Sequence, residues 1–190
     1  MTNLDSRISF MKKAHSKKEL EGLLNPLVKK WFFNKFKDFS LPQTYGVKEI
    51  HDRNNILISA PTGGTKTLTA FLSVINELVN LAMTKSLEDR VYAIYVSPLK
   101  ALNNDIHKNL EVPLKEISAL AKKEGIDLNI RIGTRTGDTT PYQRQKMLKN
   151  PPHILITTPE SLALMLGSIK FRELMFGVNW CIIDEIHAIA

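Results

Sequence analysis

The stretch APTGGTKT (residues 60–67) decides the fold of this chain. It starts at the end of a short β-branched run, residues 56–60, and leads into a long apolar segment, residues 66–83, with the pattern of a helix. Small residues between a strand and a helix let backbone N–H groups surround phosphates, while a Lys and the following hydroxyl contact the terminal phosphates and Mg²⁺. Lys66 and Thr67 fit these two roles. The sequence therefore predicts a phosphate-binding loop at this position.

Short β-branched runs and helix-like stretches keep alternating after this loop. The expected strands are residues 56–60, 91–96, 129–135, 153–157 and 180–183. The expected helices are residues 66–83, 101–110, 113–123, 141–149 and 159–166. Apolar strands that are separated by helices are typical of a parallel sheet with helices on both faces. We therefore predict an α/β fold.

Three of the expected helices are preceded by a residue that can cap them. Ser97, Thr140 and Thr158 are each followed at once by Pro, and Ser or Thr before Pro favours the start of a helix. In a parallel sheet these starts lie at one edge, where several helix N-termini would favour anions. A single cap has an ordinary structural explanation. Three caps at one edge favour an anion-binding surface.

Positive charge is concentrated in the first part of the chain. The 190 residues carry 26 Lys and Arg against 19 Asp and Glu, which gives a net charge of +7. Residues 1–55 hold 11 Lys and Arg against 6 Asp and Glu, whereas residues 56–190 hold 15 against 13. A basic surface suits a polyanionic partner, but Lys-rich faces are also common as solvated surface. Charge alone leaves both interpretations open.

Neither a membrane span nor a disulfide is expected. No apolar run approaches the roughly 20 residues that cross a bilayer, and charged residues interrupt the stretch where a signal peptide would be apolar. The single cysteine, Cys181, lies in an apolar run and is expected to be a buried structural thiol. A cytoplasmic, reducing compartment fits these features best.

Two adjacent acids end the last apolar run, in CIIDEIH (residues 181–187). Alone, such a pair is usually a turn into solvent. With a phosphate-binding loop upstream, Asp184 is expected to hold Mg²⁺ together with Thr67, and Glu185 to orient or deprotonate the attacking water. The expected catalytic residues are therefore Lys66, Asp184 and Glu185.

The segment DEIH (residues 184–187) resembles the DExH box of superfamily 2 helicases. Other motifs follow in the order of that superfamily: Gln43, APTGGTKT, SPLKAL (residues 97–102) and TTPESL (residues 157–162). The segments most similar to the large-helicase-related group are YVSPLKALNNDI (residues 95–106), RTGDT (residues 135–139) and PPHILITTPESL (residues 151–162). The resemblance covers roughly residues 31–190.

This resemblance implies a RecA-like domain of the P-loop NTPase class over residues 31–190, ending just after the DExH motif. Residues 1–30 match no motif and are expected to be a basic, helical N-terminal segment. ATP and Mg²⁺ are the implied cofactors, with Gln43 on the adenine edge. The implied nucleotide-binding residues are Gln43, Pro61, Thr62, Gly63, Gly64, Thr65, Lys66 and Thr67. An upstream aromatic, Phe36, either stacks on the base or packs in the core.

The resemblance also implies contacts to the sugar-phosphate backbone of single-stranded or partly duplex DNA or RNA. The matching residues are Pro98, Lys100, Ala101, Gly137, Asp138, Thr158, Pro159 and Glu160. His187 would couple the nucleotide site to strand binding or would be a capping histidine. A second RecA-like domain in the same full-length chain would supply an arginine finger, so these 190 residues alone are expected to be nearly inactive.

Two positions depart from the common phosphate-loop pattern, Ala60 at the first Gly and Thr65 at the Gly before Lys66. Because a β-branched residue resists unusual backbone angles, Thr65 keeps an alternative open. In that alternative the domain binds nucleotide and nucleic acid without efficient hydrolysis. An unrelated phosphate-loop kinase or GTPase fits the combined motifs poorly.

Overall fold

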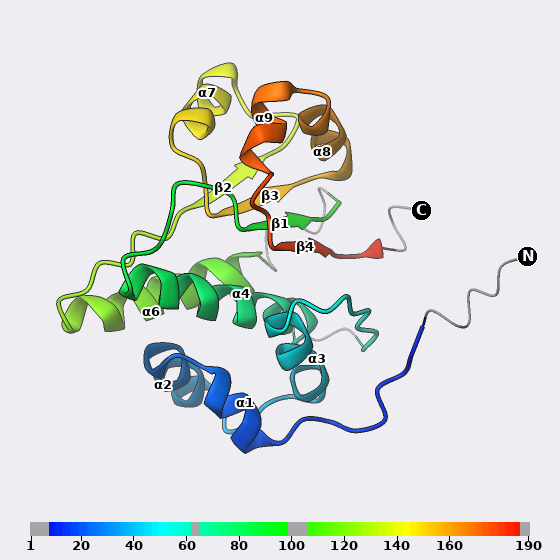
Figure 1. Ribbon diagram of the computed structural model, residues 1–190, viewed down its shortest axis with the longest axis vertical. Helices are drawn as coiled ribbons and strands as arrows, with labels where there is room; N and C mark the ends of the chain where they lie inside the picture. The colour runs from blue at the N-terminus through cyan, green and yellow to red at the C-terminus, as the bar shows by residue number, and fades with distance from the viewer. Residues whose placement is uncertain (1–7, 62–64, 99–105, 187–190) are drawn as a thin grey trace, which may run out of the picture.

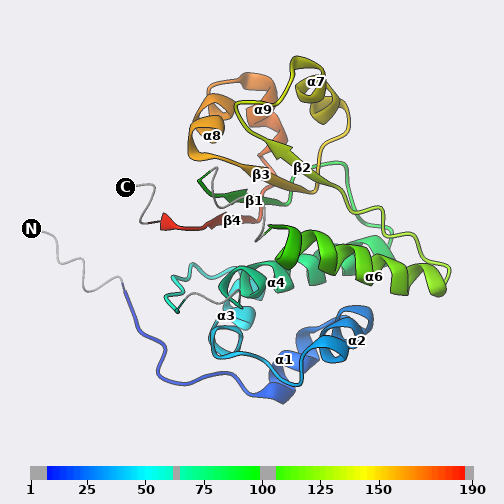
Figure 2. The same ribbon diagram turned by 180° about the vertical axis from the view of Figure 1, so that it is seen from behind.

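The computed structural model describes residues 8–61, 65–98 and 106–186. Along the chain the elements are α1 (Lys17–Leu23), α2 (Pro26–Lys35), α3 (Leu41–His51), α4 (Thr65–Met83), β1 (Ala93–Val96), the π-helix η3 (His107–Glu111), α6 (Val112–Lys123), β2 (Ile132–Arg135), α7 (Pro141–Lys149), β3 (Ile154–Thr157), α8 (Pro159–Leu166), α9 (Ile169–Leu174) and β4 (Trp180–Ile183). Helices α7, α8 and α9 lie on one side of the sheet, and α4 and α6 lie on the other (Figure 1). Helices α1, α2 and α3 form a further layer beyond α4 and α6, as the view from behind also shows (Figure 2).

The described strands form one four-stranded parallel sheet in the order β2-β3-β1-β4. At its carboxyl edge, Thr157 of β3 pairs with Arg135 of β2 on one side and with Val96 of β1 on the other. Val96 in turn pairs with Ile183 of β4. The residues that follow all four strands therefore meet at one edge, where ligands bind in open α/β sheets. This confirms the predicted parallel sheet with helices on both faces.

Residues 56–60 were expected to form a strand, and this prediction is wrong for the structure described. Their burial alternates as in a strand, because Ile56, Ile58 and Ala60 are partly buried while Leu57 and Ser59 are exposed. A strand also needs a hydrogen-bonded neighbour. Among the described strands β4 pairs with β1 alone, and a groove separates its other edge from this segment.

The other expected elements agree with the structure apart from one helix. β4, α7 and α8 have the expected bounds, and β1, β2 and β3 begin later than expected but end where expected. The helix expected over residues 101–110 is different: residues 101–105 lie outside the described ranges, and His107–Glu111 is a π-helix that leads directly into α6. Pro113 then lies in the first turn of α6, directly after the π-helix.

Helix α4 is central because it is buried on nearly all sides. Its buried residues include Phe71, Leu72, Val74 and Ile75, so this largely apolar segment becomes a core helix. Helix α3 packs on it closely at Gly46, where a Cβ would lie 2.7 Å from the Thr69 methyl group. Glycine at this position therefore sets the distance between α3 and the helix that carries Lys66.

The N-terminal helices share the core of the domain. Residue 30, the expected end of the N-terminal segment, lies within α2, whose Trp31 and Phe32 are buried in the same apolar cluster as α4 and the sheet. Asn76 of α4 accepts a hydrogen bond from the Asn25 backbone at 2.6 Å and donates one to the Leu23 carbonyl at 3.0 Å. These bonds fix α1 and α2 on α4.

Cys181 is exposed, so the prediction of a buried thiol is wrong. Residues 181 and 183 of β4 point away from α4, and both are exposed. The helices on that side cover β2 and β3 but leave this edge strand open (Figure 1). The pKa of the Cys181 thiol is raised because the surrounding residues of this chain partly desolvate it.

Candidate nucleotide site and strand-end surface

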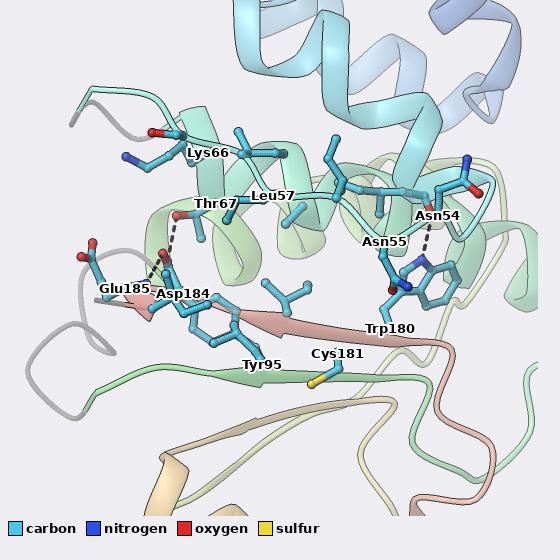
Figure 3. A pocket seen from close by; sticks show the side chains of 18 of the residues that line it. Asn54, Asn55, Leu57, Lys66, Thr67, Tyr95, Trp180, Cys181, Asp184 and Glu185 are labelled. Carbon is cyan, nitrogen blue, oxygen red and sulfur yellow. Dashed lines mark hydrogen bonds between the residues drawn. The ribbon is translucent and has the colours of Figure 1, made fainter. Parts of the chain in front are cut away.

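Asp184 follows β4 at the carboxyl edge of the sheet and accepts hydrogen bonds from two other elements (Figure 3). Its Oδ2 accepts from the Tyr95 hydroxyl at 2.6 Å and from the Thr67 hydroxyl at 3.4 Å. Tyr95 lies on β1, and Thr67 lies in the first turn of α4. We refer to Thr67, Tyr95 and Asp184 as the Asp184 cluster. Its hydroxyl and carboxylate oxygens are the kind of ligands that Mg²⁺ prefers.

Glu185, like Arg53 in the same groove, has a left-handed backbone conformation. Its φ is 50°, in the left-handed region, and its N–H donates to Oδ1 of Asp184 at 2.9 Å. A non-glycine residue in such a conformation costs on the order of 1–3 kcal/mol and is characteristic of functional sites. The turn places the Glu185 carboxylate beside Asp184 (Figure 3). The carboxylates of Asp184 and Glu185 therefore lie next to each other in different surroundings.

Lys66 lies close to these acids but bonds to its own loop. Its Nζ donates to the Ala60 carbonyl at 2.5 Å and contacts the Pro61 carbonyl at 3.5 Å. Thr65 is the first residue of α4 and has a helical backbone, so its β-branched side chain causes no left-handed strain. The backbone of Thr65 is therefore no argument against hydrolysis. The remaining argument is the volume of its methyl group near the phosphates.

A groove of about 680 Å³ connects these residues. One wall is the segment 53–60, and the other is the edge of β4 that faces away from β1. Lys66 and the Asp184 cluster lie at one end, while Trp180 lies at the other (Figure 3). The indole of Trp180 donates to the Ile50 carbonyl at 2.9 Å, which closes that far end with a buried hydrogen bond.

Gln43 lies outside the groove that the described residues form. It is 2% exposed, and its Oε1 accepts a hydrogen bond from the Ser40 backbone at 2.8 Å as part of a capping box that starts α3. Phe36 packs against the rings of Trp31 and Phe32 and is 37% exposed. Contact of either residue with adenine stays a prediction.

The predicted backbone contacts gather at the ends of β1, β2 and β3. Pro98 follows β1, Gly137 and Asp138 form the turn after β2, and Thr158 to Glu160 begin α8 after β3. The Thr158 hydroxyl accepts from the Ser161 N–H at 3.3 Å. The pKa of Glu160 is lowered by hydrogen bonds from its own N–H and from Thr158. Part of the first turn of α8 is thus satisfied by its own side chains.

The turn between β2 and α7 is held by an arginine that the sequence analysis did not single out. Arg144 donates to the Thr139 carbonyl at 2.9 Å and contacts the Gly137 carbonyl at 3.5 Å. The Thr136 N–H donates to the Thr139 hydroxyl at 2.9 Å, which closes the turn. Asp138 is thereby presented at the strand ends on a fixed loop.

Some predicted residues lie outside the described ranges, namely Thr62, Gly63, Gly64, Lys100, Ala101 and His187. The sequence analysis also missed Tyr95, because a tyrosine in an apolar strand is ordinarily a core residue. Only its place two residues before Ser97-Pro98, near the end of a strand that leads to the predicted site, could have drawn attention to it.

Comparison with known proteins decides the family. The DEAD/DEAH box helicase family matches residues 40–190, most of the chain. The chain belongs to this family. It is 56% identical over 184 residues to the ATP-dependent helicase Lhr-Core of Methanocaldococcus jannaschii, covering 96% of this chain and 22% of that protein. It is 52% identical over 183 residues to the Lhr-Core helicase of Methanothermobacter thermautotrophicus, covering 96% of this chain and 21% of that protein.

A solved structure gives the same result for this DEAD/DEAH box domain. The structure of Mycobacterium smegmatis helicase Lhr bound to ssDNA and AMP-PNP superposes with a TM-score of 0.79 and 42% identity, over 90% of this chain and 21% of that one. The RecA-like fold and the resemblance to the large-helicase-related group are thus confirmed. The chain spans about a fifth of the length of these relatives. No helix in the described part of the chain combines the length and hydropathy of a bilayer span.

Proposed function

We propose that this domain is the ATP-binding first motor domain, residues 31–190, of an ATP-dependent helicase, with residues 1–30 as a basic N-terminal segment. The observation that carries the proposal is the meeting of Lys66, Asp184 and Glu185 with Thr67 at one end of the groove. Its relatives are named ATP-dependent helicases, and the structure of the M. smegmatis relative holds AMP-PNP and ssDNA.

Each of the predicted nucleotide-site residues has a role in this proposal. Lys66 leaves the Ala60 carbonyl and contacts the β- and γ-phosphates, because a phosphate is a stronger acceptor than a neutral carbonyl. Thr67 and Asp184 hold Mg²⁺ through their oxygens, and Glu185 orients or deprotonates the attacking water. Bound Mg²⁺ supplies charge neutralisation at the phosphates. The loop residues Pro61, Thr62, Gly63, Gly64 and Thr65 surround the phosphates, and Gln43 contacts adenine.

The strand-end surface is the proposed nucleic-acid interface. Its residues are Pro98, Lys100, Ala101, Gly137, Asp138, Thr158, Pro159 and Glu160, and its partner is single-stranded or partly duplex DNA or RNA. His187 couples this surface to the nucleotide. A second RecA-like domain of the full-length protein completes the ATP site, and the protein acts in the cytoplasm.

The second candidate is a domain that binds both ligands without efficient hydrolysis. It rests on Thr65, whose methyl group takes space near the phosphates. The helical backbone of Thr65 removes the conformational argument for this candidate. Active hydrolysis in the full-length protein is therefore the favoured function.

The test is ATP turnover by the purified full-length protein with and without oligothymidylate. We expect strand-stimulated turnover that Lys66→Ala abolishes and that Lys122→Ala, a matched change on the exposed end of α6, leaves unchanged. The isolated 190 residues should turn over ATP barely, because an absent arginine finger costs on the order of 10³–10⁵ in rate. Nucleotide binding without turnover in the full-length protein would favour the second candidate.

A further inference from the structure

Arg135 ends β2 and is buried without a carboxylate partner among the described residues. It is 8% exposed, and its Nη1 is enclosed with no hydrogen-bond partner in the described part of the chain. A buried charge lowers the stability of the fold unless it is paired, so an unpaired arginine at this position suggests a functional role.

The described groups around Arg135 do not compensate its buried positive charge. Its pKa is lowered first by burial and then by the positive charge of Arg144. The helix on that side of the sheet offers a ring instead of an acid: the guanidinium carbon lies 3.6 Å from the centre of the Phe171 ring on α9. A cation over an aromatic face offsets part of the desolvation but forms no hydrogen bonds.

The neighbours of Arg135 belong to the strand-end surface. Arg135 pairs with Thr157, whose hydroxyl donates to the Arg135 carbonyl at 2.8 Å, and Thr158 follows as the cap of α8. The turn with Gly137 and Asp138 begins immediately after Arg135. Ser97, one position beyond the β1 residue that is in line with Arg135, also has an enclosed hydroxyl without a partner in the described ranges.

The described neighbours use their own donors locally, whereas the Arg135 guanidinium forms no hydrogen bond with the described residues of this edge. The N–H of Ser161 is bonded to Thr158, and that of Glu160 to its own carboxylate. Arg144 is bonded to the turn. We propose that Arg135 binds a backbone phosphate of the nucleic-acid strand, with Phe171 as the platform that holds its guanidinium between binding events. The inference rests on the proposed nucleic-acid interface.

The chemistry of the side chain fits this assignment. A guanidinium is planar, weakly hydrated and charged at every physiological pH, and its fork of N–H groups matches two phosphate oxygens. A phosphate carries no base identity, so Arg135 contributes to affinity without sequence preference. Lysine would keep the charge but lose both the fork and much of the stacking on Phe171.

The test measures binding of a fluorescent oligothymidylate to the full-length protein over a range of NaCl concentrations. Arg135→Gln should weaken binding about ten- to hundredfold at low salt. It should also reduce the slope of log affinity against log salt by about 0.7, the value for one phosphate contact on a single strand. Lys123→Gln removes a charge from the exposed end of α6 and should change neither quantity by a comparable amount.

A second measurement covers the case in which Arg135→Gln fails to fold, as judged by its thermal unfolding. Methylphosphonate groups are placed one at a time in the oligothymidylate, which removes single phosphate charges. For the parent protein one position should reproduce the loss, and for Arg135→Lys that position should matter less. A folded Arg135→Gln protein with the parent salt slope, or a parent protein insensitive to every methylphosphonate, would overturn the assignment. If the parent protein does not bind the oligothymidylate at all, the proposed interface fails as well.

Discussion

Tyr95→Phe is the change that tests the geometry of the Asp184 cluster most directly. The substitution removes one hydroxyl from a residue that is fully buried and leaves the ring in place against Phe71, at a centroid distance of 5.2 Å. No cavity of consequence is created. The change removes the 2.6 Å hydrogen bond to Oδ2 of Asp184, the oxygen that also contacts Thr67.

The expected magnitude follows from the charge of the acceptor. A hydrogen bond to a charged group contributes about 1.5–3 kcal/mol. Loss of a partner that orients a metal ligand typically costs 10–100-fold in metal affinity. Tyr95→Phe should therefore raise the Mg²⁺ concentration needed for half-maximal nucleotide binding by about 10–100-fold. Nucleotide binding at saturating Mg²⁺ should change much less.

The assay is a Mg²⁺ titration of fluorescent ATP-analogue binding to the full-length protein, with thermal unfolding as a check on folding. Tyr92→Phe is the matched control, because Tyr92 is equally buried on the same segment but its hydroxyl accepts from the Glu88 backbone, away from Asp184. A Mg²⁺ requirement for Tyr95→Phe equal to that of the parent protein would refute the role given to this hydrogen bond.

The two remaining predictions concern hydrolysis and stability. Glu185→Gln should keep nucleotide binding and remove ATP turnover, because an amide cannot accept the proton of the attacking water; a retained steady-state rate would reassign the role. His153 is 1% exposed and burial lowers its pKa from 6.5 to about 4, so the unfolded chain binds more protons between these values. Its contribution to stability is therefore present above pH 6.5 and is lost on acidification, by about 2 kcal/mol between pH 7 and pH 5. Urea unfolding at both pH values should show this loss in the parent chain and a smaller one in His153→Gln; parallel profiles would contradict the argument.

Local sequence patterns determined most of the helices and strands that surround the site. Pro141 and Pro159, each after a threonine, start α7 and α8 where expected, because proline is pre-set for the first turn and threonine caps it. The apolar runs became β1, β3 and β4 because β-branched residues pack well in a buried sheet. The order of these elements was enough to predict that the strand ends share one edge.

The pattern failed where a neighbour in space decided the outcome. Residues 56–60 have the alternation of a strand, but no described strand pairs with them, and pairing depends on the rest of the sheet. Cys181 lies in an apolar run and is nevertheless exposed, because β4 is an edge strand that α7, α8 and α9 do not cover. The periodicity of a sequence shows which residues are apolar. It does not show which face of a strand a helix will cover.

The sequence by itself determined the chemistry of the site: a lysine and a hydroxyl after a glycine-rich loop, and two acids after a strand. Only the tertiary structure placed the Tyr95 hydroxyl on Asp184 and placed Arg135 over Phe171, with no acid beside it among the residues that the structure describes. Tyr95 and Asp184 are 89 residues apart in the chain, and their contact depends on β1 and β4 being neighbours in the sheet. A motif can be recognised in the sequence because it depends only on local geometry. The partners of a buried polar group depend instead on packing between elements that are distant in the chain.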